Sequence, residues 1–164
     1  MVTLVCKYVD GHSGTECSAV LESYLSAYVA KEIMNLPPAN SKEERIKSVS
    51  LAIQNAFTRL DSDILEGRIT SIDMPSSSWF SWWTNQKVDT ALIVKNLRNA
   101  MAGSCALLAY LEGKQLYVAC TGDSRAVLGT RGLDGSFSAL EMSVDQTTKN
   151  SKEYNRIMQG IQVF

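Results

Sequence analysis

The sequence feature that most constrains the fold is a change in the spacing of apolar residues along the chain. Between residues 15 and 66, apolar side chains recur every three or four positions, which is typical of one face of an α-helix. From residue 104 to residue 142, short apolar runs alternate with glycine-containing turns, which indicates strands paired in antiparallel fashion. Helices followed by hairpins predict the α+β fold class.

The turn and capping residues place the expected elements. A strand over residues 2–9 brings Asp10 to its end, and a helix over 15–34 stops at the Leu-Pro-Pro run that begins at Leu36. Ser41 and Glu44 form a capping box that starts a second helix, which continues to about Glu66. Further strands are expected at 104–111, 115–121, 125–129 and 137–142, and further helices at 88–101 and 152–158.

Composition excludes several classes of protein. The chain has 164 residues, of which 16 are Lys or Arg and 17 are Asp or Glu, so its formal charge of −1 gives no basic footprint for nucleic acid. No apolar run approaches the roughly 20 residues that a membrane span needs. The four cysteines have no Cys-x-x-Cys spacing and His12 is the only histidine, so we expect no structural zinc site. Because Cys105 and Cys120 lie in apolar runs, we expect an intracellular protein.

The apolar pattern breaks between residues 67 and 87, which we interpret as a loop or an insertion. Three serines in a row are followed there by Trp79, Phe80, Trp82 and Trp83. Exposed tryptophan often anchors an interface, so these rings are candidates for a docking patch. The alternative is that they fold down over neighbouring helices.

Two aspartates follow apolar strands at glycine-containing turns. Asp10 begins an Asp-Gly-His-Ser-Gly run, and Asp123 lies in a Thr-Gly-Asp-Ser-Arg run. Carboxylate and carbonyl oxygens at such turns suit a hard divalent cation, and glycine lets the backbone approach closely. The alternative for both is an ordinary structural turn.

Taken together, these runs resemble the metal-dependent type 2C (PPM-type) protein serine/threonine phosphatases. Residues 9–14 resemble the family's Phe-Asp-Gly-His-Gly-Gly signature, and residues 121–128 carry its Gly-Asp-Ser-Arg signature in full. Residues 56–61 and 103–106 resemble its Ala-Phe-x-x-x-Asp and Gly-Ser-Thr-Ala segments. Residues 57–64 and 150–157 look closest to the pyruvate dehydrogenase phosphatase branch.

The resemblance implies a role for each matching residue. Asp10 would bridge two Mg²⁺ or Mn²⁺ ions, the carbonyl of Gly11 would complete one of their shells, and Asp123 would hold a third, weaker ion. A water held between the two ions would attack the phosphorus of phosphoserine or phosphothreonine, and His12 would be the general acid for the leaving oxygen. We expect Arg125 to support its turn rather than to bind phosphate. The implied partner is a phosphoprotein, with the pyruvate dehydrogenase complex and a mitochondrial location suggested by the branch alone.

The chain also departs from the family pattern. Gln146 stands where histidine is usual, and the family's upstream arginine, upstream acidic ligand and later aspartates are not in the sequence; Asp134 cannot replace them, because it lies between two strands. The resemblance implies a four-layer α-β-β-α sandwich of two antiparallel sheets, and we interpret residues 1–164 as a partial domain, incomplete at both ends. We expect this chain alone to be inactive. The alternative is a truncated or degenerate phosphatase fold that acts as a non-catalytic binding module.

Overall fold

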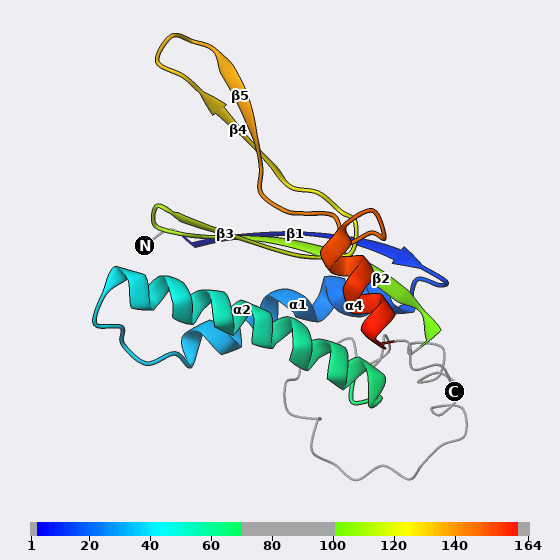
Figure 1. Cartoon of the computed structure of the whole chain (residues 1–164). Helices are drawn as coiled ribbons and strands as arrows, with labels where there is room; N and C mark the ends of the chain where they lie inside the picture. The colour runs from blue at the N-terminus through cyan, green and yellow to red at the C-terminus, as the bar shows by residue number, and fades with distance from the viewer. Residues whose placement is uncertain (1–2, 70–100, 161–164) are drawn as a thin grey trace. The chain divides into compact units, whose positions relative to one another are not determined.

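The computed structural model describes residues 3–69 and 101–160 (Figure 1). These residues belong to two compact units, which we describe separately: a helical unit, Val9–Ser104, and a strand unit, Met1–Tyr8 with Cys105–Phe164. The helix expected at 88–101 and the aromatic run at Trp79 lie outside the described residues, apart from the last residue of that helix. The described elements are β1 (Thr3–His12), α1 (Glu16–Met34), α2 (Lys42–Leu65), β2 (Gly103–Glu112), β3 (Gln115–Thr121), β4 (Val127–Arg131), β5 (Phe137–Glu141) and α4 (Ser151–Gly160).

The helical unit is built on the packing of α1 against α2 (Figure 1). The two helices have buried residues at the three- and four-residue spacing expected from the sequence, so each presents one apolar stripe. The buried residues are Val20, Leu21, Leu25, Val29 and Ile33 on α1, and Val49, Ala52, Ile53, Ala56, Leu60 and Ile64 on α2.

Two different signals fix the ends of these helices. Proline cannot continue a helix, and α1 ends at Met34 before the two prolines. At the start of α2, Ser41 Oγ accepts a hydrogen bond of 3.0 Å from the Glu44 backbone N–H, as the capping box predicts. The Glu44 carboxylate reaches back to the backbone N–H of Asn40, at 2.7 Å, one residue before the N-cap.

The first sheet has the strand order β1-β2-β3. Strands β2 and β3 are antiparallel with Leu107 opposite Cys120 and Tyr110 opposite Tyr117, which confirms the predicted hairpin. Alternate residues of β2 are buried, which is the period of two expected when a sheet buries one face. The rings of Tyr110 and Tyr117 lie 5.7 Å apart between centroids and extend this buried face across the pair.

The second sheet is the β4–β5 hairpin, whose ten strand residues are all exposed. Its register places Val127 opposite Glu141 and Arg131 opposite Phe137. We expected a strand at 125–129, but β4 begins two residues later because Arg125 and Ala126 bond to the chain that follows β5 instead. The structural turn given as the alternative for Asp123 is not a hairpin turn, since β3 pairs with β2 and β4 pairs with β5.

The expected α+β class is confirmed, with helices and two antiparallel sheets among the described residues. Strand β1 is longer than the expected 2–9, so Asp10 lies inside the strand, two residues before its end. No helix in the described part of the chain has the length and apolar character needed to cross a membrane.

Candidate functional site

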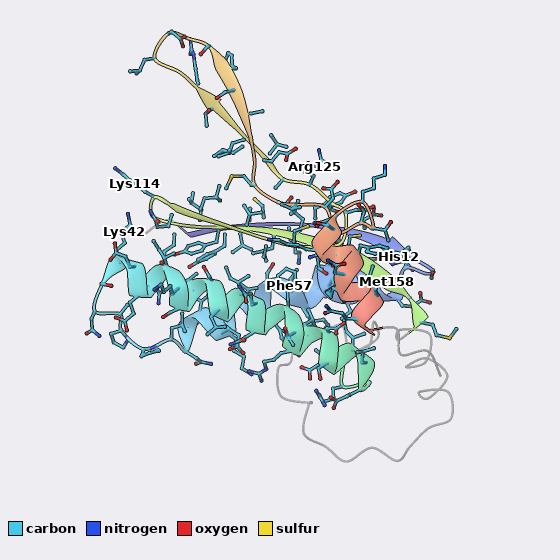
Figure 2. All side chains as sticks on the ribbon, viewed as in Figure 1. His12, Lys42, Phe57, Lys114, Arg125 and Met158 are labelled. Carbon is cyan, nitrogen blue, oxygen red and sulfur yellow. The ribbon has the colours of Figure 1, made fainter. Side chains whose placement is uncertain are left out.

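One group of candidate site residues lies at the end of β1, in the helical unit. Asp10, Gly11 and His12 are the last three residues of the strand and all are exposed. Because side chains alternate along a strand, Asp10 and His12 point to the same face. His12 is labelled in Figure 2. After it, the chain turns through Ser13, the one described non-glycine residue with a positive φ, at 60°, and enters α1.

Gly11 is needed at this position because the start of α1 lies very close to it. An ideal Cβ on Gly11 would lie 2.5 Å from Ser18 Oγ and 2.9 Å from Ser18 Cβ. Ser18 in turn donates a hydrogen bond of 3.0 Å to the carbonyl of Thr15, at the N-terminus of α1. The end of β1 is therefore held tightly against the first turn of the helix, while Asp10 and His12 stay open to solvent.

A separate group of candidate site residues lies in the loop at residues 122–126, in the strand unit. Asp123 is exposed, and its Oδ1 accepts a hydrogen bond of 3.3 Å from the Cys105 thiol. The Cys120 thiol donates a hydrogen bond of 3.0 Å to the carbonyl of Ser124, and burial raises the pKa of this thiol. A protonated thiol is the form that donates a hydrogen bond. The thiol hydrogen bonds of Cys105 and Cys120 stabilise the loop that presents Asp123.

Gln146, which follows β5 in the chain, is hydrogen-bonded to the same loop. Its side-chain Oε1 accepts a hydrogen bond of 2.9 Å from the backbone N–H of Gly122, and its own backbone N–H donates to the Gly122 carbonyl, also at 2.9 Å. Gly122 has a φ of 97°, and an ideal Cβ there would lie 2.8 Å from Cys105 Cβ. Sequence reasoning noticed Gln146 only as a departure from a pattern, and the long-range contact gave no local signal.

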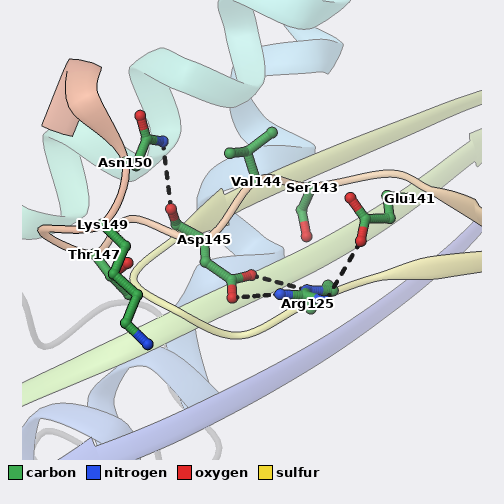
Figure 3. A pocket seen from close by; sticks show the side chains of 8 residues that line it. All are labelled: Arg125, Glu141, Ser143, Val144, Asp145, Thr147, Lys149 and Asn150. Carbon is green, nitrogen blue, oxygen red and sulfur yellow. Dashed lines mark hydrogen bonds and ion pairs between the residues drawn. The ribbon is translucent and has the colours of Figure 1, made fainter.

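Arg125 lies between two carboxylates and supports the loop, as expected. Its Nε and Nη2 atoms donate to the two oxygens of Asp145, at 3.0 and 2.7 Å, and Nη1 lies 3.4 Å from Glu141 Oε1. The hydrogen bonds from Arg125 lower the pKa of the Asp145 carboxyl. These residues line an open hollow of about 400 Å³, together with Ser143, Val144, Thr147, Lys149 and Asn150 (Figure 3). Because the guanidinium is already paired, this hollow is poorly suited to capture a phosphate through Arg125.

The residues fit a hard cation in type but not in number. The carboxylate of Asp10 has no hydrogen bond or ion pair with any described residue, which leaves both oxygens available as ligands. Asp10 and Asp123 belong to different units, and no group of three or more His, Cys, Asp or Glu side chains within residues 3–69 and 101–160 is arranged to hold a metal ion. A Mg²⁺ or Ca²⁺ site takes about six or more oxygen ligands, so these residues supply only part of one.

Comparison with known proteins decides the family. The model of the protein phosphatase 2C family matches residues 3–160, which is nearly the whole chain. The chain belongs to the protein phosphatase 2C family. It is 33% identical over 153 residues to a protein phosphatase 2C homologue of Schizosaccharomyces pombe, covering 90% of this chain and 32% of that protein. It is 34% identical over 152 residues to the mitochondrial pyruvate dehydrogenase (acetyl-transferring) phosphatase 1 of Homo sapiens, covering 92% of this chain and 25% of that protein.

A solved structure places this family member in the phosphatase 2C fold. The serine-threonine phosphatase 2C of Toxoplasma gondii superposes with a TM-score of 0.59 at 17% sequence identity, covering 96% of this chain and 44% of that chain. The expected phosphatase-like fold is therefore confirmed. The chain spans about a quarter to a third of the length of the two curated relatives.

Proposed function

We propose that this chain is the part of a metal-dependent protein serine/threonine phosphatase that carries the general acid and two metal-binding aspartates. The observation that carries the proposal is the pairing of Asp10 and His12 on one face of β1, both exposed, in a member of the phosphatase 2C family. An open carboxylate beside an open imidazole can hold a cation and deliver a proton to the same substrate group. We further propose that residues 1–164 are one segment of a larger phosphatase domain.

Each residue then has a defined task in the hydrolysis of a phosphoserine or phosphothreonine ester. Asp10 and the carbonyl of Gly11 would be ligands of Mg²⁺ or Mn²⁺, with further ligands from outside the described residues. The bound ions would supply a polarised water and neutralise charge on the phosphoryl group. His12 donates a proton to the seryl or threonyl oxygen as the P–O bond breaks, so the products are the free hydroxyl and inorganic phosphate.

Asp123 has a separate place in this proposal. Its exposed carboxylate shares one oxygen with the Cys105 thiol, which leaves the other oxygen free for a ligand. We assign it to a third ion of lower affinity, held mostly through water.

A named relative supports a proposal for the substrate and the location. One relative is named as a mitochondrial phosphatase of pyruvate dehydrogenase, and it is 34% identical across 92% of this chain. We therefore propose a phosphorylated protein of the pyruvate dehydrogenase complex as substrate, and a mitochondrial location. The second candidate function is a non-catalytic binding module, which is favoured by the lack of three assembled metal-ligating side chains among the described residues.

The test uses the complete reading frame that encodes this chain, assayed with a phosphothreonine peptide and with p-nitrophenyl phosphate in the presence of Mn²⁺. We expect Asp10→Asn to remove nearly all activity on both substrates. We expect His12→Gln to lower kcat on the peptide by about 10²–10⁴-fold, the usual contribution of general acid catalysis, and to affect the aryl ester much less because nitrophenolate leaves without a proton.

Asp134→Asn is the matched control, because Asp134 is an exposed aspartate in the turn between β4 and β5. Activity that does not depend on Mn²⁺, or equal losses in Asp10→Asn and Asp134→Asn, would contradict the enzyme proposal and favour the binding module. Equal losses on both substrates in His12→Gln would show that His12 is structural.

A further inference from the structure

The imidazole of His12 lies directly against Gly103, the first residue of β2. An ideal Cβ on Gly103 would lie 2.9 Å from Cδ2 and 3.0 Å from Cε1 of the ring, and its nearest neighbour would be Nε2. Carbon atoms in van der Waals contact are about 3.5–4.0 Å apart, so a methyl group does not fit there. The ring meets the backbone of β2 through its Nε2 corner because residue 103 has no side chain.

Within residues 3–69 and 101–160, the His12 ring makes no hydrogen bond or ion pair that would compete with this steric contact. His12 is also exposed to solvent. The backbone next to His12 is held in place, because Gly11 packs closely against Ser18 of α1. The Gly103 backbone is therefore one surface that the ring lies against.

We propose that Gly103 is a positioning residue for His12. Because Gly103 has no side chain, the imidazole of His12 can lie against the start of β2. A side chain at residue 103 would displace the ring from this position. The catalytic part of this proposal rests on the proposed function, in which His12 delivers the proton. The steric part stands on the contact alone and can be tested in a chain without activity.

The first test is a double-mutant cycle on the purified chain, with urea unfolding as the readout. We expect Gly103→Ala to lower the urea midpoint more when His12 is present than in a His12→Ala background. The reason is that the added methyl group then no longer meets the imidazole ring. Should Gly103→Ala fail to fold, recovery of folding in the double variant supports the contact.

Gly129→Ala is the matched control for this cycle. Gly129 also lies in a strand, but an added Cβ there would meet nothing within 4 Å. Its substitution is expected to have the same small effect with or without His12. Equal losses for Gly103→Ala in both backgrounds, or a double variant that also fails to fold, would overturn the proposal.

A spectroscopic test follows from His12 being the single histidine of the chain. The imidazole Hε1 signal in a proton NMR spectrum therefore reports on this ring alone. We expect Gly103→Ala to move that signal, while Gly129→Ala leaves it unchanged. An unchanged signal in folded Gly103→Ala would contradict the positioning role.

The last test joins the inference to catalysis in the complete reading frame. If His12 is the general acid, Gly103→Ala should lower kcat on the phosphothreonine peptide with little change in KM, and should spare p-nitrophenyl phosphate. A KM effect without a kcat effect would overturn the catalytic role of this contact. If the parent protein is inactive, the proposed function fails, while the mutant cycle and the NMR signal still decide the steric part.

Discussion

At the scale of single residues, Ser13 has a strained backbone conformation. Its φ of 60° is in the left-handed region, which costs an L-residue about 1–2 kcal/mol. Glycine avoids this cost but loses about 0.5–1 kcal/mol in chain entropy on folding. We therefore expect Ser13→Gly to raise the free energy of unfolding by up to about 1 kcal/mol, measured by urea denaturation.

Ser124→Gly provides the opposite case for comparison. Ser124 lies in a loop of the strand unit and is not among the described residues with positive φ. The same substitution there adds only the entropy cost, so it should destabilise the protein slightly. If both variants shift stability in the same direction, backbone strain at Ser13 is not the cause.

At the scale of elements, α1 and α2 are joined by a hydrogen bond as well as by apolar packing. The Tyr28 hydroxyl donates to Asp63 Oδ2 at 2.5 Å, and Arg68 Nε donates to Asp63 Oδ1 at 2.5 Å. Burial first, and the bond to Asp63 second, raise the pKa of Tyr28 above its ordinary value of 10.0. The neutral phenol is therefore stabilised by folding.

The sign of the pH effect follows from this raised pKa. Stability from Tyr28 is fully present below pH 10, the ordinary value, and is lost as the pH rises through the higher value of the folded state. We expect absorbance titration of Tyr28→Phe to show one late-ionising tyrosine fewer than the parent chain. Tyr154→Phe, which removes an exposed ring on α4, should leave the number of late-ionising tyrosines unchanged. The same number of late-ionising tyrosines in Tyr28→Phe and in the parent chain would refute the assignment.

At the scale of the whole molecule, we predict that the chain alone is inactive. Within the described ranges, no three metal-ligating side chains come together, and the chain spans 25% of its human relative. We expect the purified chain to hydrolyse p-nitrophenyl phosphate no faster than buffer does, even with millimolar Mn²⁺. Turnover that requires Mn²⁺ and vanishes in Asp10→Asn would contradict this expectation.

Local pattern predicted the elements well, and long-range pairing explains most of what it missed. The helix expected at 15–34 begins at Glu16 and ends at Met34, and the strand expected at 115–121 has those bounds. The predicted start of β4, residue 125, was wrong because Arg125 is hydrogen-bonded to Asp145, 20 residues away. The motif at 121–125 pointed to Asp123, yet nothing local revealed that Gln146 holds that loop.

The exposed β4–β5 hairpin has a consequence for how the Asp123 loop becomes ordered. Pairing of the two strands brings Ala126 next to Met142, whose backbone N–H donates to the Ala126 carbonyl at 2.9 Å. Closing a flexible loop costs entropy that grows with its length. Once β4 and β5 have paired, the flexible chain that still separates Arg125 from Asp145 is short, so bringing these two residues together costs less entropy. The hairpin, whose strand residues are all exposed, thus helps to order the loop that presents Asp123.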